Sequence, residues 1–89
     1  MPVEFILYSR TYCHLCDDML AALQALQGEF AFTVRVEDVD ADPALVELYD
    51  ELVPVLVGRR KGEESRLCHY FLDHDGVRAW LRNTGLAAA

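Results

Sequence analysis

The sequence predicts an α/β domain in which a four-stranded mixed sheet carries helices on both faces. Apolar, β-forming runs alternate with two helical patterns in the first part of the chain, two strand patterns then follow one another, and a last helical pattern comes after them. The expected order is β-α-β-α-β-β-α. A chain of 89 residues fits a single domain. We assign this domain to residues 1–85 and expect residues 86–89 to be a frayed tail.

The first strand and helix are predicted from residues 3–26. Residues 3–8 are rich in β-forming side chains and mostly apolar on both faces, which suits a strand buried inside a sheet. After the polar residues 9–12, apolar side chains recur at spacings of three to five, as in an amphipathic helix. These side chains are Leu15, Met19, Leu20, Leu23 and Leu26. Gly28 is a plausible terminator of this helix.

The second strand and second helix are predicted from residues 30–52. Residues 30–36 alternate as a strand does, and a right-handed crossover through the first helix would make the first two strands parallel. Asp42-Pro43 combines an N-cap residue with a proline at the first helical position, which predicts a helix start. This helix should end near Leu52, because a residue that precedes proline disfavours the α region.

A hairpin is predicted after Val53-Pro54. Residues 55–57 and 66–71 are strand-like, and the glycine-bounded charged segment 58–64 between them is interpreted as the hairpin loop. Two strands joined in this way are antiparallel.

The last helix is predicted to begin near Asp73 or Asp75, either of which is a suitable cap. It would carry Val77, Trp80 and Leu81 and end where the sequence Asn-Thr-Gly at residues 83–85 breaks the pattern.

The charge of the chain excludes some classes of partner. Eight basic and 15 acidic residues give a formal net charge of −7. Such a field repels phosphate backbones and anionic headgroups, so we expect neither nucleic acid nor a membrane surface as a partner. The segment Met1-Pro2-Val3-Glu4 has no basic flank or long apolar core of a secretory signal, and no apolar run approaches a membrane span. We therefore expect a cytoplasmic protein, which we take to be a monomer.

Cys13 and Cys16 are the residues most suited to chemistry. In the reducing cytoplasm a close cysteine pair is more often catalytic, redox-sensing or metal-binding than structural. The predicted helix starts at this pair, and free N–H groups and the helix dipole there stabilise a thiolate at Cys13. Cys16 lies about one turn further, close enough to attack a mixed disulfide on Cys13. We thus predict a nucleophilic and a resolving thiol.

Other interpretations of the cysteines are weighed against this one. A zinc site would need two more ligands, for which the candidates are Cys68, His69, His74 and His14; we expect no metal. Two buried cysteines without chemistry are another alternative. A purely structural disulfide is a poor explanation, because closing so short a loop removes little entropy from the unfolded chain. Cys68 itself is expected to be a buried small side chain, with a third reactive thiol as the alternative. His69 and His74 receive no role.

The whole pattern resembles the thioredoxin fold and, within it, the glutaredoxin family. The most specific part is the segment Tyr-Ser-Arg-Thr-Tyr-Cys-His-Leu-Cys at residues 8–16, in which a basic residue stands three before the first cysteine and Tyr directly precedes it. A Val-Pro pair before an apolar strand is the second shared feature. The resemblance covers nearly the whole chain.

The resemblance implies roles for individual residues. Cys13 would be the nucleophile, Cys16 the resolving thiol and Arg10 the basic group near a glutathione carboxylate. Pro54 would be a cis-proline facing the disulfide, and Val53 would offer its backbone to an extended substrate.

Further expected substrate contacts are Tyr12, beside the first cysteine, and Asp73 and Asp75, near the start of the last helix. Residues 71–72 are Phe-Leu where the family usually has a Gly pair that admits glutathione.

The predicted function is therefore a thiol–disulfide oxidoreductase that reduces protein disulfides or glutathione mixed disulfides. It would hold no cofactor, with glutathione as co-substrate. Two rivals stay open: a binding module of thioredoxin fold whose thiols do not turn over, and a metal or iron–sulfur carrier.

Overall fold

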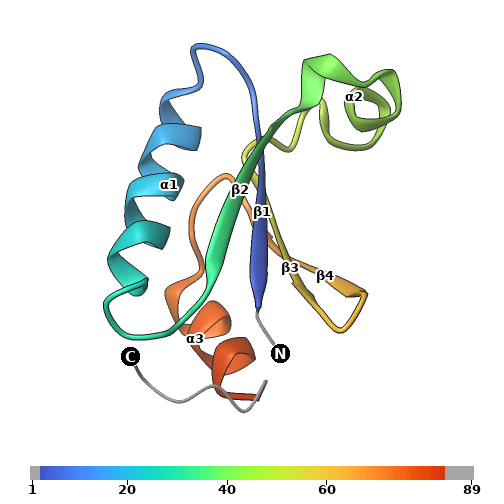
Figure 1. Ribbon diagram of the computed structural model, residues 1–89. Coiled ribbons are helices and arrows are strands. Elements are labelled where there is room, and N and C mark those ends of the chain that lie inside the picture. Colours follow the sequence, from blue (N-terminus) through green and yellow to red (C-terminus); the bar gives the residue numbers. More distant parts are fainter. Residues whose placement is uncertain (1–2, 84–89) are drawn as a thin grey trace.

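The computed structural model of the protein describes residues 3–83. The predicted domain end at residue 85 and the predicted tail 86–89 lie outside this range. The elements, in chain order, are β1 (Glu4–Ser9), α1 (His14–Leu26), β2 (Thr33–Asp38), the 3₁₀ helix η1 (Val39–Ala41), α2 (Pro43–Tyr49), β3 (Val55–Arg60), β4 (Glu63–His69) and α3 (His74–Asn83) (Figure 1). The predicted order is confirmed, with η1 added in the connection between β2 and α2.

The strands form one mixed sheet in the order β2-β1-β3-β4. β1 pairs in parallel with β2 and antiparallel with β3, and β3 pairs antiparallel with β4. β1 and β3 are the inner strands, which agrees with the apolar character of residues 3–8 and 55–57. The predicted four-stranded mixed sheet is confirmed.

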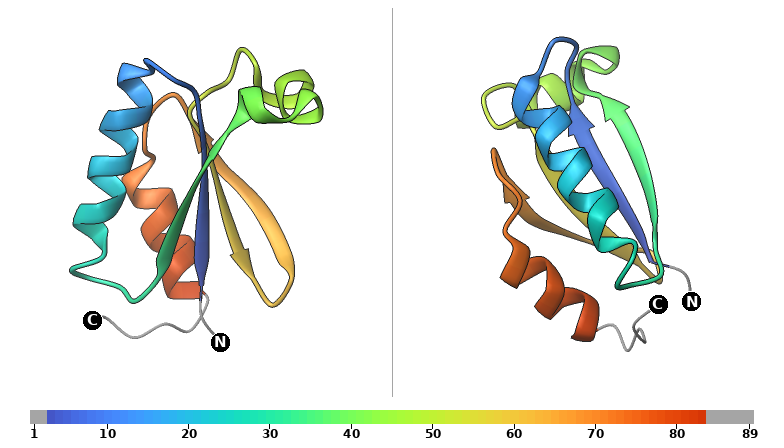
Figure 2. Two further views of the ribbon diagram at one scale, coloured as in Figure 1. Left: turned by 45° about the horizontal axis from the view of Figure 1, so that its top comes forward. Right: turned by 90° about the vertical axis from the view of Figure 1, so that its left-hand side faces the viewer.

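Alternate residues of the inner strands point to opposite faces and build two cores. Phe5, Leu7 and Leu56 lie on the face covered by α1 and α3, in a cluster that also contains Met19, Leu23, Leu26, Val77 and Leu81. Ile6, Val55 and Val57 lie on the other face, where Tyr8, Tyr49 and Leu52 pack against them. Figure 2 shows α1 and α3 together on one side of the sheet and α2 away from them. Helices on both faces are therefore confirmed.

Helix α2 begins where the sequence predicts but ends earlier. The Asp42 carboxylate accepts a hydrogen bond from the Ala44 N–H at 2.9 Å, and Pro43 occupies the first helical turn. The helix stops at Tyr49 rather than near Leu52, and the Leu52 N–H donates to the Tyr49 carbonyl in a turn. This turn brings Leu52 back onto the second core, which explains the early end.

The hairpin of β3 and β4 forms as predicted, but the predicted loop over residues 58–64 is wrong. β3 continues to Arg60 and β4 begins at Glu63, so that the turn consists of Lys61 and Gly62 alone. Both have positive φ angles, 51° and 80°, as a two-residue turn between twisted strands requires. The charged side chains around this turn are mostly exposed, whereas their backbones pair in the ladder. Charge therefore does not exclude a strand here.

Two other strand limits differ from the prediction. β2 begins at Thr33 rather than residue 30, because Phe30 and Phe32 turn into the first core ahead of the strand; the Phe32 ring meets Phe5 edge-on at 4.8 Å. β4 ends at His69 rather than residue 71, because Tyr70 adopts a φ of 64° and turns the chain away from the sheet.

Candidate functional site

Cys13 caps the N-terminus of α1 with its own sulfur. The chain leaves β1 at Ser9 and turns at Tyr12, whose φ is 60°. Cys13 is then extended, with φ −97° and ψ 103°, and its Sγ accepts a hydrogen bond from the Cys16 N–H at 3.1 Å. A helix start supplies free N–H groups and the positive end of the dipole. The sulfur of Cys13 therefore occupies the position that favours negative charge.

Cys13 and Cys16 are joined by a disulfide with an S–S distance of 2.10 Å. The two residues are not equally accessible: Cys13 is partly exposed, whereas Cys16 is only 3% exposed. A reagent from solvent therefore reaches the Cys13 side of the bond first. Because Cys13 is partly exposed, the alternative of two buried cysteines does not describe this pair.

The Val53–Pro54 segment lies at the same end of the sheet as Cys13. Its peptide bond is cis, and Pro54 is buried directly before β3. Val55 is paired with Tyr8, the penultimate residue of β1, so the start of β3 and the loop to Cys13 emerge side by side (Figure 1). The structure thus brings the segment predicted to bind substrate to the sheet end that carries the cysteine pair.

Tyr70 fixes the Val53–Pro54 segment through two hydrogen bonds, and the sequence alone does not predict this role. Its N–H donates to the Pro54 carbonyl at 2.9 Å, and its hydroxyl donates to the Glu51 carbonyl at 2.5 Å. Within residues 3–83, the Val53 backbone makes no such hydrogen bond. Its N–H and carbonyl are therefore available to a bound chain. No sequence signal points to Tyr70, because its contacts depend on the positive φ at this residue.

Arg10 takes part in an ion-pair network. Its guanidinium forms two hydrogen bonds with the Asp40 carboxylate, at 3.0 and 2.9 Å, and one with the Asp50 carboxylate at 2.7 Å. These hydrogen bonds raise the pKa of Arg10 above its usual value. A fourth donates to the Asp50 carbonyl at 3.3 Å. A glutathione carboxylate would have to compete with both aspartates, so the proposed role of Arg10 stays a prediction.

Tyr12, Asp73 and Asp75 occupy different settings. Tyr12 is fully exposed directly before Cys13. Asp73 caps α3, where its carboxylate accepts a hydrogen bond from the Gly76 N–H at 3.1 Å, and Asp75 lies in the first turn of that helix. The cap explains why α3 begins here. The structure shows no contact of either aspartate with the cysteine pair, and their predicted role in binding stays untested.

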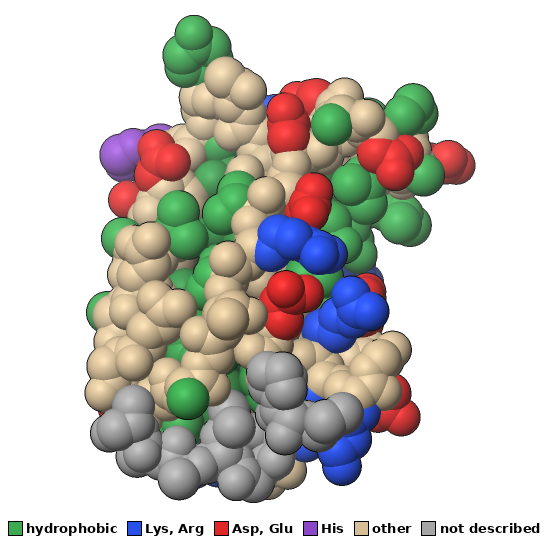
Figure 3. Space-filling view, viewed as in Figure 1, with side chains coloured by type: hydrophobic (Ala, Val, Ile, Leu, Met, Phe, Trp, Pro, Cys, Tyr) green, Lys and Arg blue, Asp and Glu red, His purple; other side chains and the backbone are tan. Residues whose placement is uncertain are grey.

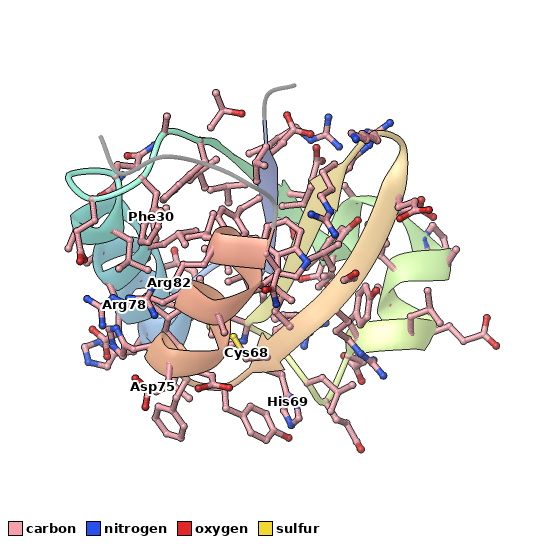
Figure 4. The ribbon with its side chains drawn as sticks, turned by 90° about the horizontal axis from the view of Figure 1, so that it is seen from below. Phe30, Cys68, His69, Asp75, Arg78 and Arg82 are labelled. Atoms are coloured by element: carbon pink, nitrogen blue, oxygen red, sulfur yellow. A yellow bond between two sulfur atoms is a disulfide. The ribbon has the colours of Figure 1, made fainter. Side chains whose placement is uncertain are left out.

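Cys68 is a half-buried residue of β4 on the side of the sheet that faces α3. It pairs with Leu56 across the ladder and packs against the first core cluster. Figure 4 shows its sulfur beneath α3, whereas the neighbouring His69 points away. Burial raises the pKa of the Cys68 thiol, although a hydrogen bond from the Asp73 backbone acts in the opposite direction. The expected role as a small core side chain fits this setting.

We expect Cys68 to be alkylated last when the reduced protein is treated with iodoacetamide at neutral pH. Its raised pKa keeps the thiol protonated, and only a thiolate reacts with iodoacetamide. Its partial burial also limits access of the reagent. Peptide mass spectrometry over a time course should show Cys13 labelled first. Labelling of Cys68 as fast as Cys13 would contradict this assignment.

Two further findings concern metal sites and membrane spans. Among the described residues, no group of three or more His, Cys, Asp or Glu side chains is arranged to hold a metal ion. No helix within residues 3–83 is long and apolar enough to cross a membrane.

The sequence matches the family model described as "Glutaredoxin-like domain (DUF836)" over residues 4–82. The chain belongs to this glutaredoxin-like family. The resemblance inferred from residues 8–16 is thus confirmed. A comparison with curated proteins found no match.

Two solved structures share substantial sequence with this glutaredoxin-like chain. The solution structure of Ne2328 from Nitrosomonas europaea is 40% identical, with 91% of this chain and 93% of that chain covered and a TM-score of 0.81. The X-ray structure of XcR50 from X. campestris is 36% identical, with 89% and 96% covered and a TM-score of 0.61. Thioredoxin 1 from Thermosipho africanus is 20% identical, with 92% and 98% covered and a TM-score of 0.68. This last likeness supports the thioredoxin-like fold.

Proposed function

We propose that this glutaredoxin-like protein is a thiol–disulfide oxidoreductase that reduces disulfides through Cys13 and Cys16. The observation that carries the proposal is a partly accessible sulfur at a helix N-cap, bonded to a buried partner one turn away. The cap favours the thiolate of the accessible cysteine. The buried cysteine stays within bonding distance while a substrate is attached.

The proposed reaction transfers two electrons from the protein to the substrate. The Cys13 thiolate attacks one sulfur of a substrate disulfide, forms a mixed disulfide and expels the other sulfur as a thiolate, which takes up a proton. Cys16 then loses its proton and attacks the Cys13 sulfur. This step forms the Cys13–Cys16 bond and releases the second substrate thiol. Two thiols are made as the protein dithiol becomes a disulfide.

The Val53–Pro54 segment would align the substrate for this attack. Within residues 3–83 the N–H and carbonyl of Val53 have no hydrogen-bond partner, so they suit two main-chain hydrogen bonds to an extended chain, which require no particular side chain. Tyr70 fixes the segment through the Pro54 and Glu51 carbonyls. Pre-ordered donors and acceptors reduce the entropy that binding would otherwise cost.

Regeneration needs a second thiol system, for which we propose two glutathione molecules that end as one glutathione disulfide. The first forms a mixed disulfide with Cys13 and frees Cys16, and the second removes the first from Cys13. The reduced pair is thereby restored with a balanced count of electrons and protons.

The test follows the cysteine pair in redox buffers of graded glutathione ratio. After acid quenching and alkylation, mass spectrometry should show a reversible loss of two hydrogens confined to Cys13 and Cys16. The same protein should turn over a peptide–glutathione mixed disulfide with glutathione as reductant. A protein that never forms this bond, or forms it but turns over no disulfide, would be a binding module instead.

A further inference from the structure

A groove of about 500 Å³ runs along α2 and the turn that follows it. It is lined by Val46, Glu47, Leu48, Asp50, Glu51 and Leu52. Half of these side chains are apolar and half are carboxylates. The groove therefore has both apolar and acidic walls, whereas an ordinary solvent-exposed helix surface is mainly polar.

Among the apolar side chains of the groove, Leu48 is exposed, whereas Val46 and Leu52 are half-buried. α2 contains no buried residue, and Leu48 is 61% exposed. Figure 3 shows hydrophobic side chains at the surface beside acidic ones at the corner of the molecule where α2 lies. If an apolar side chain of a partner covers the exposed Leu48, apolar surface is removed from water, which favours binding.

The charge of the groove is only partly balanced. Asp50 is paired with Arg10, but this guanidinium is shared with Asp40, so one cation serves two carboxylates. Glu47 and Glu51 form no ion pair within residues 3–83. A bound segment that carries Lys or Arg would therefore complement the groove, whereas an acidic segment would be repelled.

The groove is continuous with the segment that we propose to bind substrate. Its last lining residue, Leu52, directly precedes Val53, and Leu52 also packs against the sheet. The Glu51 carbonyl is held by the Tyr70 hydroxyl. An extended chain advances about 3.3 Å per residue. If a substrate cysteine is bound at Cys13, the substrate residues a few positions away from it would therefore reach α2.

We propose that this groove docks the segment that flanks the reactive cysteine in a protein substrate, and that it selects an apolar side chain next to Lys or Arg. The assignment rests on the proposed oxidoreductase function, because it names the substrates of that same site. A second copy of this chain is a poor occupant, since two molecules of net charge −7 repel one another. Glutathione is also disfavoured here, because its carboxylates would face Glu47 and Glu51.

Binding is tested first, without redox chemistry. Two peptides are compared, each with Ser in place of the substrate cysteine and a leucine nearby. One carries Lys beside the leucine and the other carries Glu. Calorimetry measures the affinity of each peptide for the full chain at low and at high salt. We expect the Lys peptide to bind at least about threefold more tightly, with the difference shrinking at high salt. Equal affinities would overturn the proposal.

Variants then locate the effect. Glu47→Lys and Leu48→Ser should each weaken binding of the Lys peptide about three- to tenfold. Glu63→Lys in the distant hairpin and Val36→Ser, whose side chain is 49% exposed on β2, are the matched controls and should leave the affinity unchanged. Controls as damaging as the groove variants would mean that only overall charge or stability matters, which contradicts a specific groove.

Turnover separates this inference from the proposed function. Groove variants should reduce a low-molecular-weight disulfide at the wild-type rate and lose kcat/KM only for a disulfide of the Lys peptide. If the wild-type protein reduces small disulfides but treats Lys and Glu peptides alike, the groove proposal fails alone. If it reduces neither kind of disulfide, the oxidoreductase function fails, and the substrate assignment fails with it.

Discussion

Replacing Cys16 with serine is expected to arrest the reduction of protein disulfides at a stable mixed disulfide on Cys13. Cys16 is the sulfur bonded to Cys13 and is 3% exposed, so the variant has lost the thiol that would release the substrate. Cys68 is half-buried beneath α3 and packs against the first core. We expect complete loss of protein-disulfide turnover, together with a one-to-one adduct in non-reducing mass spectrometry that dithiothreitol releases.

Three controls separate chemistry from folding. Cys16→Ala should trap the same adduct, which excludes an effect of the serine hydroxyl, a group that is costly to bury without a partner. Cys13→Ser should form no adduct and retain no activity. Cys68→Ser should turn over at the wild-type rate. An adduct on Cys16 in the Cys13→Ser protein would reverse the proposed roles, and wild-type turnover by Cys16→Ser would refute a dithiol mechanism for protein disulfides.

Local patterns in the sequence were sufficient for most of the fold. The apolar run at 3–8 predicts an inner strand, and Asp42-Pro43 predicts the start of α2, because both signals lie within a few neighbouring residues. The cysteine pair is a local signal of the same kind. The prediction failed at the hairpin, where Arg59 and Glu64 were assigned to a loop although their backbones pair. Exposed charges fit an antiparallel ladder as well as a loop.

The rest of the site depends on contacts between distant parts of the chain. Arg10 meets Asp40 and Asp50 across 30 and 40 residues of sequence, and no periodicity connects these positions. Tyr70 reaches Pro54 only because the chain turns sharply after β4. Sequence patterns give the strands and the helix starts. The partners of a long polar side chain depend on how these elements are placed in space, which a local pattern does not contain.

The close approach of α3 to β3 is another contact between residues that are distant in the sequence. Gly58 lies in the middle of β3, opposite Phe5, and a Cβ added to it would lie 2.6 to 2.9 Å from three carbons of the Trp80 ring. The Trp80 ring also lies 5.4 Å from the Phe5 ring and 5.9 Å from the Arg60 guanidinium. In the loop that the sequence predicts for residues 58–64, the missing side chain of Gly58 would signify a turn. In the structure, it makes room for the indole.

We expect Gly58→Val to destabilise the protein by about 1–3 kcal/mol, the usual cost of overpacking a core. To make room for the valine side chain, the indole must move, α3 must shift away from the sheet or the strand must bend. For a domain of this size, each kcal/mol lowers Tm by about 4–8 °C. Thermal unfolding followed by circular dichroism measures the loss. Gly28→Ala is the matched control, because its Cβ would meet only the Ala25 carbonyl at an ordinary 3.6 Å, and it should leave Tm nearly unchanged.

A double-mutant cycle identifies the cause. Trp80→Ala alone removes a large, partly buried side chain that packs against the first core, and it is itself destabilising. If the indole is what the introduced valine side chain would strike, the Gly58→Val change should cost much less in the Trp80→Ala background than in the wild-type protein, with a coupling above about 0.5 kcal/mol. Additive losses would show that the strand requires glycine for another reason. The redox site lies at the end of the sheet where β3 begins, whereas Gly58 is in the middle of that strand, so a folded Gly58→Val protein should still form the Cys13–Cys16 bond.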